Sequence, residues 1–241
     1  MSDPGKADRT FLLTISWGAT AEHQAVLCCK TGALRGPKSA RLLVAALGSH
    51  SREAAFYTHL APGLRAAGVR VPHCFHSDVA GLLAHTFFLL EGVTGVTAVT
   101  DGATMGSTEP ELVVLRSFLT EEATVHAMHW GADDGVDSPL AVLSGSVSMR
   151  NFLASSPVLK PHKRLLNAAL AFTANTARCP TTLIHGDARL GNALLHPDGR
   201  CTLVDWEVAA AGTPLLDVVY CIWMCSEAGT DRGQLAGAAE G

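Results

Sequence analysis

The sequence predicts an α+β protein of two lobes, a small antiparallel β-rich lobe followed by a larger, mainly helical lobe. The first ninety residues contain three strand-like apolar runs, at 11–17, 25–30 and 82–91. Helical spacing of apolar residues dominates most of the remaining chain, above all at 108–130 and 160–178. A glycine-rich, irregular stretch that begins at Gly92 separates the two regions. We therefore expect lobes at 1–92 and 93–241.

The shorter elements are predicted from local signals. A helix at 40–48 ends at a glycine, and a second helix at 51–60 has Ser51 as a possible cap. Thr108 and Glu111 form a capping box that predicts the start of the long helix. Three short strands are expected near the C-terminal end, at 182–185, 192–196 and 201–205.

Composition narrows the classes of function. Of the 241 residues, 48% are hydrophobic and 17% are charged, which supports a packed core and argues against intrinsic disorder. The net charge of -4, without a basic block, argues against nucleic acid or an anionic membrane surface as the main partner. Seven cysteines without a Cys-x-x-Cys motif predict reduced thiols in the core. No run is long and apolar enough to span a membrane, so we expect a soluble, cytoplasmic protein.

The most informative segment lies between residues 183 and 205. Asp198-Gly199 is typical of a two-residue hairpin turn, and a turn centred there would place Asn192 directly opposite Asp205. Directly opposed residues of a hairpin have Cβ atoms roughly 5 Å apart. An amide oxygen and a carboxylate at that separation suit Mg²⁺, which prefers oxygen ligands. Asp187 precedes Asn192 by five residues, and a second carboxylate there could receive the proton of an attacking hydroxyl group. The pattern therefore predicts phosphoryl transfer.

These residues resemble a known family. The motif is similar to that of the aminoglycoside phosphotransferase and choline kinase superfamily, especially its choline-kinase-like and ecdysteroid-kinase-like branch, which is related to the protein kinases. Its residues are His185-Gly186-Asp187-x-Arg189-x-x-Asn192, followed by Asp205-Trp206-Glu207 and Asp217. The spacing is specific, because a hairpin of suitable length and a third aspartate accompany the short His-Gly-Asp string.

The resemblance implies a protein-kinase-like fold, ATP and Mg²⁺ as cofactors, and transfer of the γ-phosphate to a hydroxyl group of a small molecule. It implies that Asp187 is the catalytic base and that Asn192 and Asp205 are the Mg²⁺ ligands. Arg189 would support catalysis. His185 and Asp217 would be structural, with Asp217 as a buried acid that braces the catalytic loop.

The same resemblance suggests the nucleotide side of the site. Lys30 ends the strand 25–30, where a phosphate-binding lysine is expected, and Glu53 would pair with it. Backbone groups near Glu91 and Val93 would contact adenine. The alternatives are an ordinary lysine at a strand end and a solvated glutamate on a helix.

Both ends depart from the family pattern. One convincing strand, 11–17, precedes the lysine strand, and no glycine-rich loop pattern is present; the sequence also ends soon after Asp217. We expect the first strand, the glycine-rich loop and several C-terminal helices to be missing. The alternative function is therefore an inactive, pseudokinase-like nucleotide-binding protein or a family fragment. Aminoglycosides, choline, steroids and sugars all remain open as acceptors, as do ATP or GTP as donor and the oligomeric state.

Two further features have competing interpretations. His126 and His129 could form a metal pair on a helix, but packing is the favoured interpretation for both. Glu207 comes two residues after the motif aspartate and could contact a cationic substrate or pair locally.

Overall fold

The computed structural model describes most of the chain. The described residues are 8–18, 23–32, 49–80, 85–99, 109–132, 135, 137–143, 163, 164, 167, 171 and 179–227. The predicted helix at 40–48 and the capping residue Thr108 lie outside them. The predicted helix at 160–178 is described at four positions, each helical. No helix of the described part has the length and apolar character that a membrane span requires.

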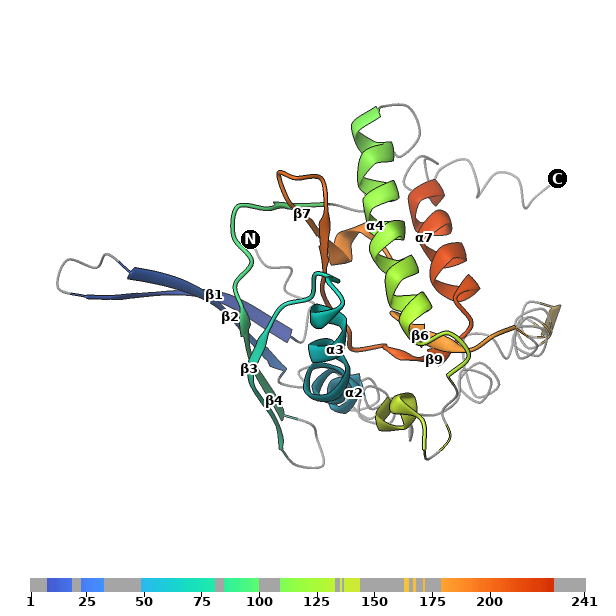
Figure 1. The fold of residues 1–241 in the computed structure, drawn as a ribbon, viewed down its shortest axis with the longest axis horizontal. Helices are drawn as coiled ribbons and strands as arrows, with labels where there is room; N and C mark the ends of the chain where they lie inside the picture. Colours follow the sequence, from blue (N-terminus) through green and yellow to red (C-terminus); the bar gives the residue numbers. More distant parts are fainter. Residues whose placement is uncertain are drawn as a thin grey trace.

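Four antiparallel strands form the N-terminal sheet, in the order β1-β2-β4-β3 (Figure 1). They are β1 (Asp8–Trp17), β2 (His23–Gly32), β3 (Cys74–Ala80) and β4 (His85–Glu91). Lys30 lies on the inner strand β2, where its Cα is paired with Thr10 on one side and with the buried Phe88 on the other. The sheet therefore fixes the position of Lys30 from two neighbouring strands.

The helical segment after the sheet's first hairpin is not one regular helix. It consists of α2 (Ser49–Ala55), the π-helical turn η1 (Phe56–Leu60) and α3 (Ala61–Ala66). Pro62 explains the wide turn, because its ring would clash with the carbonyl four residues earlier and it has no N–H to donate. The amide of Ala61 instead bonds to the carbonyl of Phe56, five residues back.

Among its described residues, the C-terminal part combines two long helices with short strands. The helices α4 (Glu109–Met128) and α7 (Leu215–Glu227) run side by side (Figure 1), and Asp217 contacts His126 between them. Two small sheets lie below and beside them. They contain β5 (Thr97–Ala98), β7 (Ala193–Leu195) and β8 (Cys201–Leu203), and β6 (Thr182–Ile184) with β9 (Ala210–Gly212). The turns η2 (Pro139–Leu143) and η3 (Leu190–Asn192) complete the described elements.

The predicted register of the β7–β8 hairpin is wrong by one residue. Ala193 pairs with Leu203, and the amide of Val204 bonds to the carbonyl of Asn192, so Asn192 faces Val204 rather than Asp205. A two-residue loop would join Pro197 and Arg200 by two hydrogen bonds, and one of them needs an N–H on residue 197, which proline lacks. The loop is three residues long, with Gly199 at φ 80° and the amide of His196 bonded to the carbonyl of Arg200.

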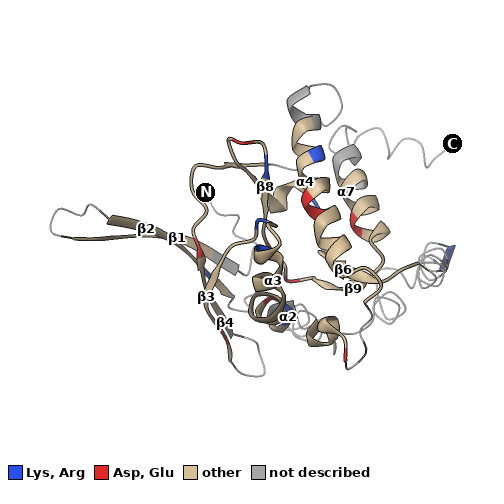
Figure 2. Cartoon of the chain, in the orientation of Figure 1, with Lys and Arg blue, Asp and Glu red and all other residues tan. Residues whose placement is uncertain are grey.

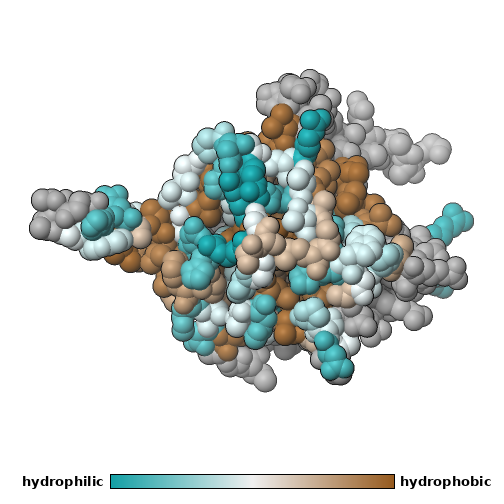
Figure 3. Space-filling model, viewed as in Figure 1, coloured by the Kyte–Doolittle hydropathy of each residue, from teal (hydrophilic) through white to brown (hydrophobic). Residues whose placement is uncertain are grey.

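The hydrophobic core lies where the helical segment of the first lobe meets the C-terminal part, and not along the β1–β2 hairpin. Phe56 and Trp206 stack with ring centroids 4.0 Å apart, and both side chains are fully buried. By contrast, Figure 3 shows brown, hydrophobic atoms on the surface of the β1–β2 hairpin. Its large apolar side chains are exposed by 42% to 68%, namely Phe11, Leu12, Leu13, Ile15 and Trp17. The contact between Phe56 and Trp206 thus joins the helical segment of the first lobe to the motif region.

Candidate active site

A buried carboxylate holds the loop that comes after β6. Both oxygens of Asp217 accept backbone amides, from His185 at 2.8 Å and from Gly186 at 2.9 Å. Gly186 has φ 82°, and a Cβ there would lie 2.5 Å from the carbonyl oxygen of Val208. The loop therefore needs both a carboxylate at position 217 and a glycine at position 186. These two hydrogen bonds are contacts of the kind that the resemblance implied for Asp217, and its support of catalysis stays a prediction.

Asp187 lies at the centre of a small polar cluster. Asn192 donates its side-chain amide to the backbone carbonyl of Asp187 at 2.9 Å and to Oδ2 of the same residue at 2.8 Å. Arg189 Nε donates to that Oδ2 at 3.0 Å. Because Asn192 uses its nitrogen for Asp187, its side-chain oxygen is the atom left to act as a metal ligand. The structure thus brings Asp187, Arg189 and Asn192 together.

His185 is held as a neutral side chain behind this cluster. Its Nε2 donates to the carbonyl of Val204 at 3.0 Å, and its ring lies 4.4 Å from that of Trp206. Burial lowers the pKa of His185 below its ordinary value, although Asp217 opposes the shift. A buried neutral imidazole with one ring nitrogen used in a backbone hydrogen bond fits the predicted structural role.

Lys30 joins two carboxylates from different elements. Its Nζ lies 2.9 Å from Glu53 Oε2 on α2 and 2.6 Å from Asp205 Oδ1 after β8. Burial disfavours the ammonium group, but the two carboxylates outweigh burial and raise the pKa of Lys30 above its ordinary value. Lys30 is therefore charged over the physiological pH range, and the predicted ion pair with Glu53 is present.

The two carboxylates differ in their environment. Glu53 is 1% exposed, and burial raises its pKa to about 7 although Lys30 opposes the shift. Asp205 retains 33% of its side-chain exposure; burial raises its pKa, but Lys30 outweighs burial and the net shift is downward. Asp205 also has φ 69°, a left-handed conformation that is uncommon for residues other than glycine. An ionised, partly exposed carboxylate on a special backbone suits a residue that binds a ligand.

The donor set around Asp205 suits a hard divalent cation. The ligand atoms of Asp205, Glu53 and Glu207 all lie within 4.8 Å of one another. Asn192 offers an amide oxygen on the same loop as Asp187, and Asp205 has a second carboxylate oxygen besides the one at Lys30. Carboxylate and amide oxygens are the ligands that Mg²⁺ prefers. These residues could therefore hold Mg²⁺ together with the phosphates of a substrate.

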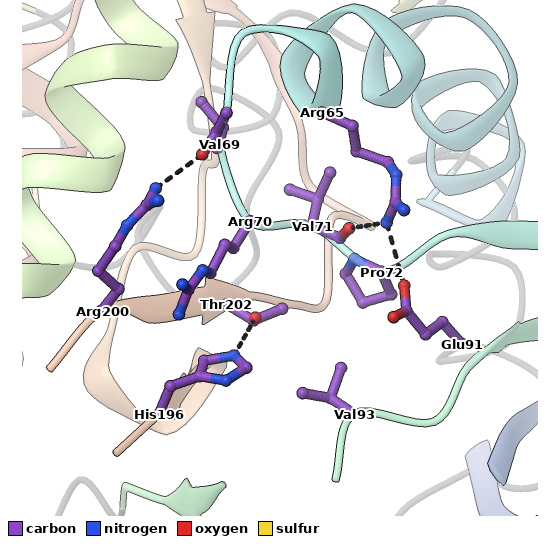
Figure 4. A pocket seen from close by; sticks show the side chains of 11 residues that line it. Arg65, Val69, Arg70, Val71, Pro72, Glu91, Val93, His196, Arg200 and Thr202 are labelled. Carbon is purple, nitrogen blue, oxygen red and sulfur yellow. Dashed lines mark hydrogen bonds and ion pairs between the residues drawn. The ribbon is translucent and has the colours of Figure 1, made fainter. Parts of the chain in front are cut away.

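Glu91 and Val93 lie at a separate cavity of about 320 Å³ (Figure 4). Its walls come from the segment after α3 and from the β7–β8 hairpin, and its described lining does not include Lys30, Asp187 or Asp205. The side chain of Glu91 accepts Arg65 Nη1 and the amide of His73, both at 3.0 Å. The side chains of Glu91 and Val93 are therefore not brought to the Lys30 cluster, and a contact of their backbone with adenine stays a prediction.

Three contributors to the site were not assigned by the sequence analysis. His126 Nε2 lies 3.0 Å from Asp217 Oδ2, and the expectation of a structural, packed histidine named no such partner. Gly92 donates its amide to the carbonyl of Val26 at 2.9 Å, and any Cβ there would clash with that residue. Phe56 packs on Trp206 one turn after Glu53. The one sequence signal that bears on the position of Phe56 is Pro62, which follows the π-helical turn that begins at Phe56.

Comparison with proteins of known structure shows which proteins have a similar fold. APH(2″)-IIia, solved as its GDP and kanamycin complex, matches at 16% identity over 88% of this chain and 73% of that chain, with a TM-score of 0.54. Choline kinase LicA from Streptococcus pneumoniae matches at 13% identity over 90% and 72% of the two chains, with a TM-score of 0.51. At these identities the likeness concerns the fold, and it confirms the predicted two-lobed, kinase-like α+β architecture.

Sequence comparison identifies the family. The model of the phosphotransferase enzyme family matches residues 35–241, and the chain belongs to this family. A shorter match, 48% identical over 42 residues, relates it to acyl-CoA dehydrogenase family member 10 of Mus musculus. That match covers 17% of this chain and 4% of the mouse protein. The resemblance stated from the motif is thereby confirmed at the level of the family.

Proposed function

We propose that this chain is an ATP- and Mg²⁺-dependent phosphotransferase that moves the γ-phosphate to a hydroxyl group of a small molecule. The observation that carries the proposal is the position of Lys30, whose ammonium group lies against both Glu53 and Asp205. In a kinase-like fold a lysine held by a helix glutamate contacts the nucleotide phosphates, and a metal-binding aspartate lies beside it. In this proposal residues 1–92 form the nucleotide lobe and residues 93–241 the catalytic lobe.

Mg²⁺ held by Asn192 and Asp205 would neutralise charge on the phosphates. The chain's own groups would do the rest. Lys30 would hold the phosphates, and Asp187 would orient the acceptor hydroxyl and take its proton as the new P–O bond forms and the bond to the nucleoside diphosphate breaks. Arg189, whose Nε lies 3.0 Å from Asp187 Oδ2, would hold that carboxylate in position. Catalysis of this kind depends mainly on positioning and charge neutralisation.

The acceptor class is part of the proposal. One structural neighbour is solved in complex with kanamycin, and the other is a choline kinase. Amino sugars and amino alcohols are therefore the first acceptors to test. A cationic acceptor would find Glu207 within 4.8 Å of Asp205. GTP is to be tested beside ATP as the phosphate donor.

Turnover by the Asp187→Asn variant tests the function. We expect kcat to fall by roughly 10²–10⁴, the typical contribution of a positioned general base, with little change in nucleotide affinity. The measurement is release of nucleoside diphosphate with a panel of aminoglycosides, choline, steroids and sugars. Asp78→Asn, on the exposed part of β3, is the matched control and should keep wild-type rates. Equal turnover in the wild-type and Asp187→Asn proteins would contradict the proposed function.

The second candidate is a nucleotide-binding protein without transferase activity. Its support is the cluster of Lys30, Glu53 and Asp205, which could hold nucleotide phosphates whether or not a phosphoryl group is transferred. Nucleotide binding without turnover for any acceptor in the panel would favour this second function.

A further inference from the structure

A second cluster of ligand-type side chains lies behind the loop that carries Asp187. It consists of Glu122 and His126 on α4 and Asp217 on α7, and all three are buried. Figure 2 shows an acidic segment on each of these neighbouring helices. His126 Nε2 lies 3.0 Å from Asp217 Oδ2 and 3.8 Å from Glu122 Oε2. The ligand atoms of the three residues lie within 4.8 Å of one another.

Glu122 is the feature that packing does not explain. Both of its carboxylate oxygens are shielded from solvent, and within the described part of the chain neither has a hydrogen-bond partner. A buried carboxylate without a partner is strongly unfavourable. Burial and the neighbouring Asp217 together raise the pKa of Glu122 well above its ordinary value. A proton alone would still leave the carboxyl group without a hydrogen-bond acceptor, because His126 Nε2 at 3.8 Å is too distant.

Space for an occupant is available at this point. A cavity of about 130 Å³ is bordered by Glu122, His126 and Asp217, and the other described residues that line it are apolar. In their ionised form the carboxylates of Glu122 and Asp217 would carry two negative charges, which one divalent cation would balance. Bonds from a metal ion to imidazole nitrogen and carboxylate oxygen are about 2.0–2.2 Å long, so donors around one ion lie roughly 3–4 Å apart. The measured separations of 3.0 and 3.8 Å fall in this range.

We propose that Glu122, His126 and Asp217 form a second divalent-cation site, distinct from the Asn192–Asp205 site and selective for ions that accept imidazole, such as Zn²⁺. His126 would ligate through Nε2 and carry its proton on Nδ1, and coordination would replace the hydrogen bond between His126 and Asp217. Asp217 also holds the amides of His185 and Gly186. The ion would therefore strengthen the support of the catalytic loop from behind. This inference does not depend on the proposed phosphotransferase activity.

The test is ion binding by chelator-treated full-length protein that carries Asp205→Asn, which weakens the other candidate site. Zn²⁺ uptake is measured by elemental analysis after dialysis, and Co²⁺ binding is followed by absorption. We expect one tightly held ion per chain, with a Co²⁺ spectrum that lacks a thiolate charge-transfer band, since the cysteines are not ligands. Glu122→Gln and His126→Gln should each lose this ion.

Two nearby residues, one on α4 and one in the turn that follows it, are matched controls. Glu121, which pairs with Arg200, and His129, three residues from His126, should keep the ion when replaced by glutamine. Glu122→Gln is isosteric and uncharged, so it preserves packing and remains informative if His126→Gln fails to fold. The proposal is overturned if Glu122→Gln takes up as much ion as its parent. It is also overturned if the parent takes up none, in which case a proton or a water molecule occupies the cluster.

Discussion

Lys30 shows how one side chain can connect three elements. It lies on β2, contacts Glu53 on α2 and reaches Asp205 in the segment after β8. The side chain of Lys30 is 12% exposed and that of Glu53 is 1% exposed, so water screens their pairing only weakly. Removing one partner of such a buried pair leaves an uncompensated charge, which is the costly way to break it.

Lys30→Met is therefore expected to destabilise the fold by about 3 kcal/mol or more at pH 8. Burial raises the pKa of Glu53 to about 7, and Lys30 opposes that shift. Without Lys30 the pKa of Glu53 would be higher still. Below pH 7 Glu53 is protonated in the folded wild-type protein and in the folded variant. Above pH 7 Glu53 is ionised in the folded wild-type protein but still protonated in the folded variant. The unfolded variant has already released this proton, so its folded state is penalised as the pH rises. The cost of Lys30→Met should thus grow between pH 6 and pH 8.

Urea unfolding at the two pH values measures this cost. In a Glu53→Gln background the group that titrates is gone, so Lys30→Met should cost the same at pH 6 and pH 8. A cost that is independent of pH in the wild-type background would contradict the assigned coupling between Lys30 and Glu53.

At the scale of single residues, the sequence predicted much of the polar cluster around Asp187, because the spacing and type of motif residues indicate their chemistry. Asp187, Arg189 and Asn192 were expected together from a short motif, and they are together. His126 was harder, since a histidine on an amphipathic helix gives no sign of its partner on another helix. Contacts between distant segments depend on packing, which periodicity alone does not specify.

At the scale of elements, the turns decide where the motif residues lie. Pro197 and the left-handed Gly199 give the β7–β8 hairpin a three-residue loop, so the dipeptide Asp198-Gly199 predicted the hairpin correctly but its register wrongly. A slip of one residue moves side chains to the opposite face. Asp205 lies two residues after the end of β8, has a positive φ and contacts Lys30. Such a conformation cannot be inferred from an aspartate in the sequence.

Two glycines in left-handed conformations should respond very differently to alanine. Gly199→Ala should cost about 1 kcal/mol, since φ is 80° but a Cβ would meet open space. Gly186→Ala should cost roughly 3 kcal/mol or more, because the new Cβ would also clash with the backbone carbonyl of Val208. Chemical denaturation measures both values, and turnover should fall in Gly186→Ala alone. Equal losses of stability would show that the close approach at Gly186 is relieved by a shift of the loop.

At the scale of the whole molecule, the two lobes share one core. Phe56 from the helical segment stacks on Trp206 from the motif region, and Lys30 makes the polar connection beside them. The fold class was predictable because strands and helices separate along the sequence. The packing between the lobes was not, since an aromatic stack between residues distant in the chain has no local signature in the sequence. A ligand bound between the lobes would stabilise both of them together.

Nucleotide with Mg²⁺ should accordingly raise the melting temperature of the whole chain in one transition. At a concentration 100 times Kd, binding adds about 2.7 kcal/mol, which corresponds to roughly 5–10 °C for a domain of this size. The measurement is thermal unfolding with ATP or GTP, each with Mg²⁺ or with EDTA. Because Asp205 is a proposed Mg²⁺ ligand, Asp205→Asn should lose most of the Mg²⁺-dependent part of the shift, while Asp78→Asn should retain it. A shift of equal size in EDTA would contradict the assignment of Asn192 and Asp205 as the metal ligands, and no shift with either nucleotide would contradict both proposed functions.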